Sequence, residues 1–336
     1  ATDLGFSRHT DKWQDVVNDP KVELISVCTP NNTHSEIAIS ALKTGKHVWC
    51  EKPMSSSMED SQKMAEASLN TNAKTIIGYN YTKNPIVIHA KEIIEKGTIG
   101  RVSGFFCRYD VDNEADGKKP WSWRMSKKLS GTGANGDILS HVISIAHYLT
   151  NSKISRVVGD ISIIHNKRID PKNSGKTKEV DNDDMVSALV HFENGVHGHI
   201  GASRVSWGKK CGLTWEVHGT EGTICYNQER LNEIKLFTRQ KDSSTDGFRT
   251  ILSGPDHPFY SSFLPNGGHG LGFMDVKICE LQGLLNSIEN DEPTWPSFTD
   301  GLAIEKVMES VDISAINKKW ISIKSVSYTH LRAHET

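Results

Sequence analysis

The sequence predicts an α/β protein in which a doubly wound parallel sheet is followed by an α+β domain with a large, mainly antiparallel open sheet. Short apolar runs rich in β-branched residues alternate with helical segments over residues 22–78, as they do in βαβ units. From residue 101 onward, strand-like segments follow one another with few helices between them. The length of 336 residues accommodates two such domains.

The parallel sheet is predicted from three strands and the helices between them. The strands lie at residues 22–28 (VELISVC), 47–50 and 74–78. Thr33 and Glu36 form a Thr-x-x-Glu capping box, which predicts a helix that Gly45 ends. Ser57 is the expected N-cap of a second helix, which runs to about residue 69. This order implies right-handed crossovers, with ligands bound beyond the carboxyl ends of the strands.

The second domain is predicted from a longer series of strands. They lie at residues 102–109, 154–163, 185–192, 196–205, 213–217, 222–227 and 231–238, and helices near 273–288 and 301–316 precede a last strand at 320–323. Asn194-Gly195 supplies the positive φ angles of a tight hairpin turn. We therefore expect one domain at residues 1–101 and a second at residues 102–325.

Both ends of the sequence need separate treatment. The chain opens inside an element at Ala1, without an initiator methionine, so we expect the first βαβ unit of the parallel sheet to be missing. Residues 326–336 (VSYTHLRAHET) resemble a translated frame of a sequencing adapter. We exclude them from the fold as a non-native tail, the alternative being a natural histidine-containing tail.

Composition and charge exclude several classes of protein. The formal net charge is −2 and acidic and basic residues are interspersed, so no basic stripe is available for a nucleic acid. No apolar stretch approaches the roughly 20 residues of a membrane-spanning helix. The six cysteines are scattered and form no Cys-x-x-Cys pair, as is usual for reduced cysteines. A cytoplasmic protein fits best, unless an export signal precedes this sequence.

Glu51-Lys52-Pro53 is the first candidate site. It directly follows the strand at 47–50, and therefore lies at the ligand-binding edge of the predicted sheet. Pro53 restricts Lys52 to extended backbone conformations, which would aim the ammonium in a defined direction. The alternative is a surface turn with both charges solvated, and the motif taken alone favours that alternative.

Asp137 and His141 form the second candidate site. They follow a glycine-rich segment at 131–136, expected to be a flexible loop, at the start of a helix. Residues four apart share a helix face, so the carboxylate and the imidazole can project into one cleft. A nearby carboxylate orients an imidazole and raises its basicity toward that needed to remove an alcohol proton. The alternative is an N-cap aspartate above a core histidine.

Together these motifs resemble the glucose-fructose oxidoreductase / inositol dehydrogenase / MocA (Gfo/Idh/MocA) family, and within it the inositol and levoglucosan dehydrogenase-like subgroup. The similar segments are TPNNTH at 29–34, GKHVWCEKP at 45–53, GYNYTKNP at 78–85 and SGTGANGDILSH at 130–141. The resemblance implies a Rossmann domain followed by an α/β domain whose open sheet forms homodimers or homotetramers.

The resemblance also implies an NAD(P)-dependent sugar or polyol dehydrogenase, because Lys52, Asp137 and His141 match the family's catalytic residues. His141 would remove the hydroxyl proton while Asp137 holds the imidazole. Lys52 would hydrogen-bond the reacting oxygen and the nicotinamide ribose, and hydride would pass to the nicotinamide. The expected substrate is an inositol-like polyol or an anhydrosugar.

Cofactor contacts are implied only where the motifs match. These positions are Thr29, Pro30, Asn31, His34, Glu51, Lys52 and Asn80. The family's glycine-rich turn and ribose-reading residue come before them, and this sequence starts after both, so we expect the chain as it stands to bind dinucleotide poorly. The remaining residues do not distinguish NAD from NADP.

Substrate contacts are expected at three further residues. Trp123 and Arg124 offer an aromatic plane and a donor fork for a sugar ring, with a packed tryptophan and a salt-bridged arginine as an equal alternative. His269, in the glycine-rich loop at 266–270, resembles a pocket-facing histidine of the subgroup, and its alternative is a surface loop. Leu139 stands where many relatives have glycine, and it would narrow the pocket.

Two other functions stay open as alternatives. A glycosidase of the same fold that uses NAD transiently has an Asn-x-Tyr-Pro-Thr-His type of segment around its histidine, so Asp137 favours the dehydrogenase. A non-catalytic dinucleotide-binding paralogue would not need the three matching catalytic residues. His197 and His199 alternate along one strand, but no third ligand follows at a suitable spacing, and we expect no metal site.

Overall fold

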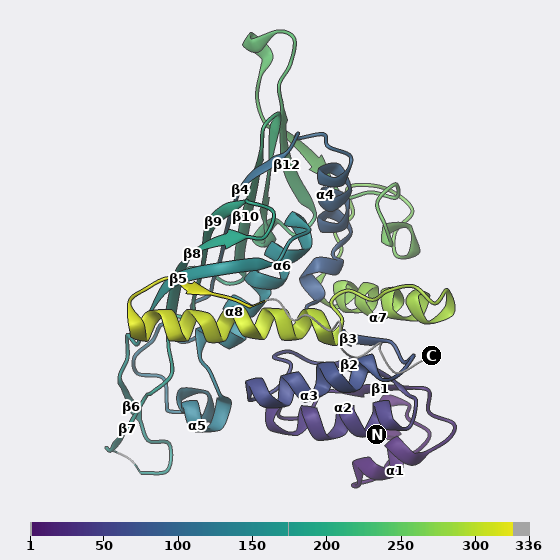
Figure 1. Cartoon of the computed structure of the whole chain (residues 1–336), viewed down its shortest axis with the longest axis vertical. Helices are drawn as coiled ribbons and strands as arrows, with labels where there is room; N and C mark the ends of the chain where they lie inside the picture. The colour runs from purple at the N-terminus through teal and green to yellow at the C-terminus, as the bar shows by residue number, and fades with distance from the viewer. Residues whose placement is uncertain (1, 174, 325–336) are drawn as a thin grey trace. The chain divides into compact units, whose positions relative to one another are not determined.

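The computed structural model, which describes residues 2–173 and 175–324, divides into two units whose sequences interleave. Unit 1 contains the residues up to Asn84 together with Gly272–Glu305. Unit 2 contains Pro85–Leu271 together with the residues from Lys306 onward. Each unit has its own principal sheet (Figure 1).

Unit 1 is built on a parallel sheet in the order β1-β2-β3, which confirms the predicted alternation of strands and helices. The elements are β1 (Leu24–Val27), β2 (His47–Cys50), β3 (Thr75–Ile77), α1 (Trp13–Asn18), α2 (His34–Lys43) and α3 (Met58–Leu69). Val48 pairs with Ile25 on one side and Thr75 on the other, and all three are buried. Ser57 caps α3 as predicted, accepting from the amide of Asp60 at 3.2 Å.

The capping box predicted at Thr33 is wrong. The Thr33 hydroxyl makes no cap to the helix, and lies instead 2.7 Å from both the Thr29 hydroxyl and the Pro30 carbonyl. A 3-10 turn precedes α2, and within it the amide of His34 donates to the carbonyl of Asn31. Thr33 has helical backbone angles (φ −108°, ψ −8°) and not the extended ones of an N-cap residue, so its hydroxyl closes the turn after β1 and makes no bond to the amides of α2.

Two helices from late in the sequence complete unit 1. Helix α7 (Phe273–Glu289) packs on the 3-10 turn at Asn80–Lys83, and α8 (Phe298–Asn317) begins in unit 1. Just before α8, the carbonyl of Pro296 accepts from the amide of Ile77 at 2.9 Å. A segment that the sequence assigned to the second domain therefore lies at the edge of β3 in unit 1. The chain passes from one unit to the other after Asn84, after Leu271 and after Glu305, whereas the expected division lay between residues 101 and 102.

Unit 2 is built on a mainly antiparallel sheet, as predicted, with the strand order β13-β12-β11-β10-β4-β9-β8-β5-β14 among the described residues. The strands are β4 (Val102–Asp110), β5 (Ile154–Ser162), β8 (Met185–Phe192), β9 (His197–Ser203), β10 (Gly212–Gly219), β11 (Gly222–Asn227), β12 (Glu233–Thr238), β13 (Arg249–Leu252) and β14 (Ile321–Ser322). Only β4 and β9 pair in parallel. A small hairpin of β6 (Lys167–Ile169) and β7 (Thr177–Glu179) lies between β5 and β8 in the sequence.

Helices cover one face of this sheet. They include α4 (Pro85–Glu95) and α6 (Ser140–Thr150), which pack on each other while α6 also contacts β4 and β9 (Figure 1). The other face is open: Leu189, His199 and Phe106 occupy paired positions on β8, β9 and β4, and Leu189 and Phe106 are 52% and 42% exposed. The sequence did not predict α4.

The hairpin between β8 and β9 has one positive φ angle where the sequence predicted two. Gly195 has a φ of 85°, whereas Asn194 is not in the left-handed region. The amide of Gly195 donates to the carbonyl of Phe192 at 3.1 Å, and the amide of Phe192 donates to Val196 at 2.8 Å. A glycine in the left-handed region after an ordinary turn closes this hairpin, as in a G1 bulge.

The tail at residues 326–336 lies outside the described residues. Among the helices that the structure describes, none combines the length and the apolar character required to cross a membrane. The six cysteines are free thiols.

His147 is a buried polar residue on α6. Its Nε2 accepts a hydrogen bond from the amide of Ile154 at 3.1 Å. Burial, with a smaller contribution from the positive charge of Lys153, lowers the pKa of His147 from 6.5 to about 3. The folded chain therefore holds this imidazole neutral under conditions in which the unfolded chain protonates it.

We expect His147 to make the free energy of unfolding depend on pH. Between pH 6.5 and 3 the unfolded state binds one proton more than the folded state at this residue, so stability falls as the pH falls. Urea denaturation of His147→Gln should show a loss from pH 6.5 to 5 that is smaller than the loss of the wild type by about 2 kcal/mol. His9→Gln is the control, because His9 is exposed. Equal losses in wild type and His147→Gln would contradict the prediction.

Candidate active site

In unit 1, the turn after β1 carries four of the predicted cofactor residues. Thr29 and Pro30 are exposed and Asn31 is half-buried. His34 is buried, with Nε2 2.8 Å from the carbonyl of Thr29 and Nδ1 3.1 Å from the carbonyl of Pro53. Both ring nitrogens thus face backbone atoms, and His34 joins the turn after β1 to the turn after β2. We assign it a positioning role in place of the predicted cofactor contact.

The turn after β2 holds Glu51 and Lys52, which are both half-buried. One oxygen of Glu51 lies 2.6 Å from the Nζ of Lys277, on α7, and the other accepts from the amide of Lys52 at 3.3 Å. A Cβ at Gly78 would lie 2.9 Å from the Glu51 carboxylate, so a larger residue there would make this side chain shift. The carboxylate next to Lys52 is therefore fixed from two sides.

The other end of the same turn is held by a second acid. The amide of Met54 donates to Glu305 at 3.0 Å. Burial raises the pKa of Glu305 to about 8. The segment from Glu51 to Met54 is thus anchored by side chains of α7 and α8.

Lys277 neutralises two acids at once. Its Nζ lies 2.6 Å from Glu51 and 2.9 Å from Glu280, which is fully buried and also accepts from the indole of Trp49 at 3.1 Å. Burial raises the pKa of Glu280. Burial opposes the charged form of Lys277, but the two carboxylates outweigh it and raise the pKa of Lys277. The sequence analysis missed this cluster, because 226 residues separate Lys277 from Glu51.

Asn80 begins the 3-10 turn that follows β3. Its side chain is buried, and its Nδ2 has no hydrogen-bond partner among the described residues. A buried donor without a partner is a costly arrangement that a ligand can relieve. Thr29, Lys52 and Asn80 each follow one of the three parallel strands, at the carboxyl ends of the sheet. This set fits the hydroxyl and phosphate oxygens of a dinucleotide.

In unit 2, Asp137 and His141 lie where a π-helical turn (Asn135–Leu139) passes into α6. Asp137 is exposed and His141 is buried, with its ring edge-on to Tyr109 at a centroid distance of 5.9 Å. Turns of this kind are frequent at functional sites. Leu139, in the same turn, is fully buried and packs in the core of the unit.

The glycine turn, which we define as residues 131–136, is anchored and not the flexible loop that the sequence suggested. The carboxylate of Asp183 accepts from the amides of Gly133 at 3.0 Å and Asn135 at 2.6 Å. Burial raises the pKa of Asp183, and these two backbone hydrogen bonds oppose that rise. The sequence analysis missed Asp183.

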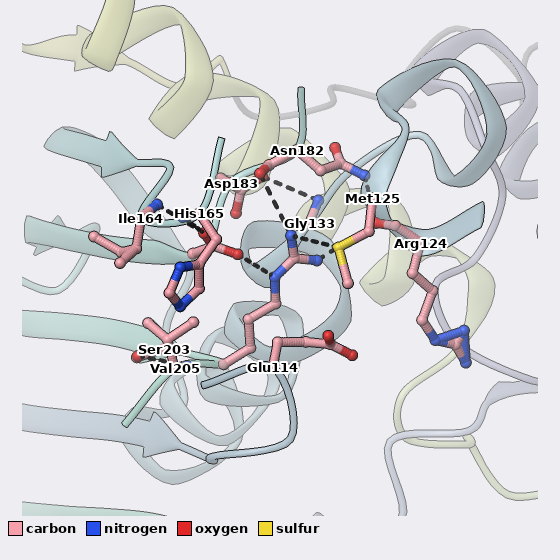
Figure 2. A network of polar contacts seen from close by, with 12 residues as sticks. Glu114, Arg124, Met125, Gly133, Ile164, His165, Asn182, Asp183, Ser203 and Val205 are labelled. Atoms are coloured by element: carbon pink, nitrogen blue, oxygen red, sulfur yellow. Dashed lines mark hydrogen bonds and ion pairs between the residues drawn. The ribbon is translucent and has the colours of Figure 1, made fainter. Parts of the chain in front are cut away.

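Trp123 and Arg124 lie in a 3-10 turn just before the glycine turn. The guanidinium of Arg124 stacks over the Trp123 ring at 4.5 Å, and Trp123 is 48% exposed. Among the described residues Arg124 forms no ion pair, and its side chain extends away from the polar network that holds its backbone (Figure 2). A packed tryptophan and a salt-bridged arginine, the alternatives, are therefore not observed, and the stacked pair offers an open planar surface.

His269 lies in an exposed loop of unit 2. The hydroxyl of the buried Tyr260 fastens this loop, because it donates to the carbonyls of Asn266 and His269. The imidazole is in solvent, and no described side chain is hydrogen-bonded to it. The loop is thus fixed through its backbone while the histidine side chain stays open.

Each unit contributes its own part of the chemistry. Unit 1 has the strand-end turns of a dinucleotide-binding sheet and a lysine beside an anchored carboxylate. Unit 2 has an acid and an imidazole one helical turn apart, and an exposed Trp123 ring stacked with Arg124. These features define the chain as a nicotinamide-dependent oxidoreductase.

Comparison with known proteins identifies the family. Residues 1–79 match the oxidoreductase family with an NAD-binding Rossmann fold, and residues 87–225 match the GFO/IDH/MocA C-terminal domain. The chain is 34% identical to levoglucosan dehydrogenase from Pseudarthrobacter phenanthrenivorans, over 97% of this chain and 86% of that protein. The chain therefore belongs to the Gfo/Idh/MocA family, which confirms the resemblance seen in the sequence.

Other relatives and solved structures support the same family. Myo-inositol 2-dehydrogenase from Thermotoga maritima is 28% identical over 89% of this chain and 79% of its own. A levoglucosan dehydrogenase in complex with NADH and levoglucosan has a TM-score of 0.92, with 34% identity over 97% of this chain and 87% of that one. An NAD binding oxidoreductase from Klebsiella pneumoniae has a TM-score of 0.93, with 36% identity over 97% and 86%.

We expect Lys277→Met to destabilise the protein by roughly 3 kcal/mol, because it leaves two neighbouring acids, one of them buried, without a cation. Glu280→Gln in the same chain should recover part of this loss, giving a favourable coupling in a double-mutant cycle measured by urea denaturation.

Lys63→Met is the matched control for this cycle. Lys63 pairs with Glu59 at 2.7 Å on the surface of α3, and its replacement should lower stability far less than that of Lys277, because solvent screens the pair. Additive effects of Lys277→Met and Glu280→Gln would contradict the assignment.

Proposed function

We propose that this protein oxidises a secondary alcohol of a sugar or polyol, with an inositol-like compound or an anhydrosugar such as levoglucosan as substrate. The observation that carries the proposal is the position of His141 at the start of α6, one helical turn after Asp137. An imidazole placed with a carboxylate in this way is suited to take a proton from an alcohol.

Each proposed catalytic residue has one task. His141 accepts the proton of the substrate hydroxyl, and Asp137 favours the imidazolium that results. Lys52 donates a hydrogen bond to the oxygen on which negative charge develops. A bound nicotinamide dinucleotide supplies the hydride acceptor. Glu51 accepts a hydrogen bond from the backbone amide of Lys52, and Lys277 fixes the Glu51 carboxylate.

We propose NAD rather than NADP as the cofactor. Support comes from the family's NAD-binding domain and from levoglucosan dehydrogenase structures in complex with NADH. The residues proposed to contact it are Thr29, Pro30, Asn31, Glu51, Lys52 and Asn80. Comparison of kcat/KM for the two cofactors tests this choice, and a higher value with NADP would contradict it.

The stacked Trp123 and Arg124 are the proposed substrate surface, together with His269. A tryptophan face packs well against the C–H face of a sugar ring, and a guanidinium donates to ring hydroxyls. Relatives act on related compounds, as the names levoglucosan dehydrogenase and myo-inositol 2-dehydrogenase state.

We also propose that the open face of the sheet in unit 2 forms a homodimer or homotetramer in the cytoplasm. Large apolar side chains exposed on a sheet face are typical of such surfaces, and Phe106 and Leu189 provide them. Sedimentation equilibrium tests the assembly, and a monomer at micromolar concentration would contradict it.

The full-length gene product should reduce NAD with one or more of levoglucosan, inositols and common aldoses, followed by the absorbance of reduced nicotinamide. His141→Ala should lower kcat about a thousandfold, and Lys52→Ala by about a hundredfold or more, because they remove the base and the oxyanion donor. NAD binding should remain measurable in both variants.

Lys63→Ala and His9→Ala are the matched controls, since both residues are exposed and neither belongs to the proposed site. No reduction with any substrate, despite NAD binding, would contradict the dehydrogenase and favour the glycosidase or the non-catalytic paralogue.

A further inference from the structure

Three consecutive polar residues, Asn182, Asp183 and Asp184, directly precede strand β8 and are all buried. They are the centre of the polar network in Figure 2, to which the segments at 124–125, 133–135, 164–165 and 203–205 converge. Most buried polar side chains are hydrogen-bonded. The partners of these three residues therefore show what the network holds in place.

Asp183 holds the glycine turn through three hydrogen bonds. Its carboxylate oxygens accept from the amide of Gly133 at 3.0 Å and from the amide of Asn135 at 2.6 Å, one oxygen for each amide. Its carbonyl accepts from the amide of Ala134 at 3.0 Å. A Cβ at Gly133 would lie 2.1 Å from this carbonyl, so the approach is possible only for glycine.

Asp184 and Asn182 hold the segments on either side. Asp184 accepts from the Nε of the buried Arg204 at 2.7 Å and from the amide of Ile164 at 2.7 Å. Asn182 donates to the carbonyl of Arg124 at 3.0 Å. The proposed substrate segment and the glycine turn are thus fastened to the same strand start.

A second anchor acts on the far side of the glycine turn. The side-chain amide of Asn135 donates to the carbonyl of Met308 at 3.0 Å and to Asp312 at 2.9 Å, both on α8. This bond orients the side chain of Asn135, whereas Asp183 fixes the backbone amides that begin the π-helical turn. Asp183 therefore acts on the part of the chain that leads directly into Asp137.

We infer that Asp183 is a positioning residue for catalysis: its carboxylate fixes the backbone of the glycine turn, and through it the placement of Asp137 and His141. The inference rests on the proposed function for its catalytic consequence. Asp183 itself touches neither substrate nor cofactor in this account, because both of its oxygens are used by backbone amides.

The two oxygens of a carboxylate are what this contact requires. Each faces an N–H donor, so an asparagine of the same shape would satisfy only one of them and would turn its own N–H₂ group toward the other. A buried amide left without an acceptor is unfavourable. Asp183→Asn should therefore loosen the glycine turn without removing any volume from the core.

The test combines kinetics with hydrogen exchange in the full-length gene product. Asp183→Asn should lower kcat about tenfold or more while KM for the substrate and Kd for NAD change about twofold or less, and amide exchange in the peptide that covers residues 131–139 should become about tenfold faster. Gly133→Ala displaces the same contact from the other side and should give the same pattern. Gly133→Ala replaces Asp183→Asn in the test if Asp183→Asn does not fold.

Asp112→Asn is the matched control. Asp112 also accepts from a backbone amide, that of Gly208 at 3.2 Å, and from the ammonium of Lys210 at 2.6 Å, but among the described residues it makes no hydrogen bond to the glycine turn. Its replacement should leave both kcat and exchange over residues 131–139 within about twofold of the wild type.

Two results would overturn the inference. One is Asp183→Asn with unchanged kcat and unchanged exchange in the glycine turn. The other is a loss of kcat without faster exchange, because the carboxylate would then act in some way other than by holding the turn. A wild type that binds NAD but turns over no substrate would refute the proposed function alone, and exchange would still decide whether Asp183 fixes the turn.

Discussion

The burial of two adjacent carboxylates, Asp183 and Asp184, is the constraint on which the candidate site of unit 2 depends. A buried carboxylate is unfavourable unless hydrogen bonds and a counter-charge replace water. The chain provides these as backbone amides of the glycine turn and of residues 164–165, and as the guanidinium of Arg204. The bonds of Asp183 also fix the segment that leads into Asp137 and His141.

In unit 1, a lysine provides the counter-charge for a buried carboxylate. Glu280 is fully buried and Glu51 is half-buried, and Lys277 bridges them. The consequence is that Lys52 follows a carboxylate whose position is set by α7 and by the absence of a side chain at Gly78. In both units the residues proposed for chemistry lie on short turns or, for His141, at the start of a helix that such a turn leads into, and neighbouring helices and strands hold those turns in place.

The sequence predicted what depends on near neighbours. The period of apolar residues located β2 at its observed bounds, and the residue types of Glu51-Lys52-Pro53 and of Asp137 and His141 identified the candidate site. It failed at Thr33, because a 3-10 turn that no pattern encodes gives this residue helical backbone angles, which an N-cap residue does not have.

Contacts between residues that are distant in the sequence could not be predicted, for a physical reason. The amides bound by Asp183 lie 50 and 48 residues earlier in the sequence, and only folding of the sheet brings Asp183 close to them. The sequence analysis drew nothing from the run Asn182-Asp183-Asp184, because spacing along the chain does not say which groups such a run binds.

The central claim, hydride transfer from a sugar or polyol carbon, is tested most directly with levoglucosan or an inositol deuterated at its carbinol carbons. Mass spectrometry of the reduced nicotinamide should find one deuterium per cofactor, and the amount of labelled cofactor should rise in proportion to the product. Product that forms without net labelled cofactor would contradict the account and indicate chemistry in which the cofactor is only transiently reduced.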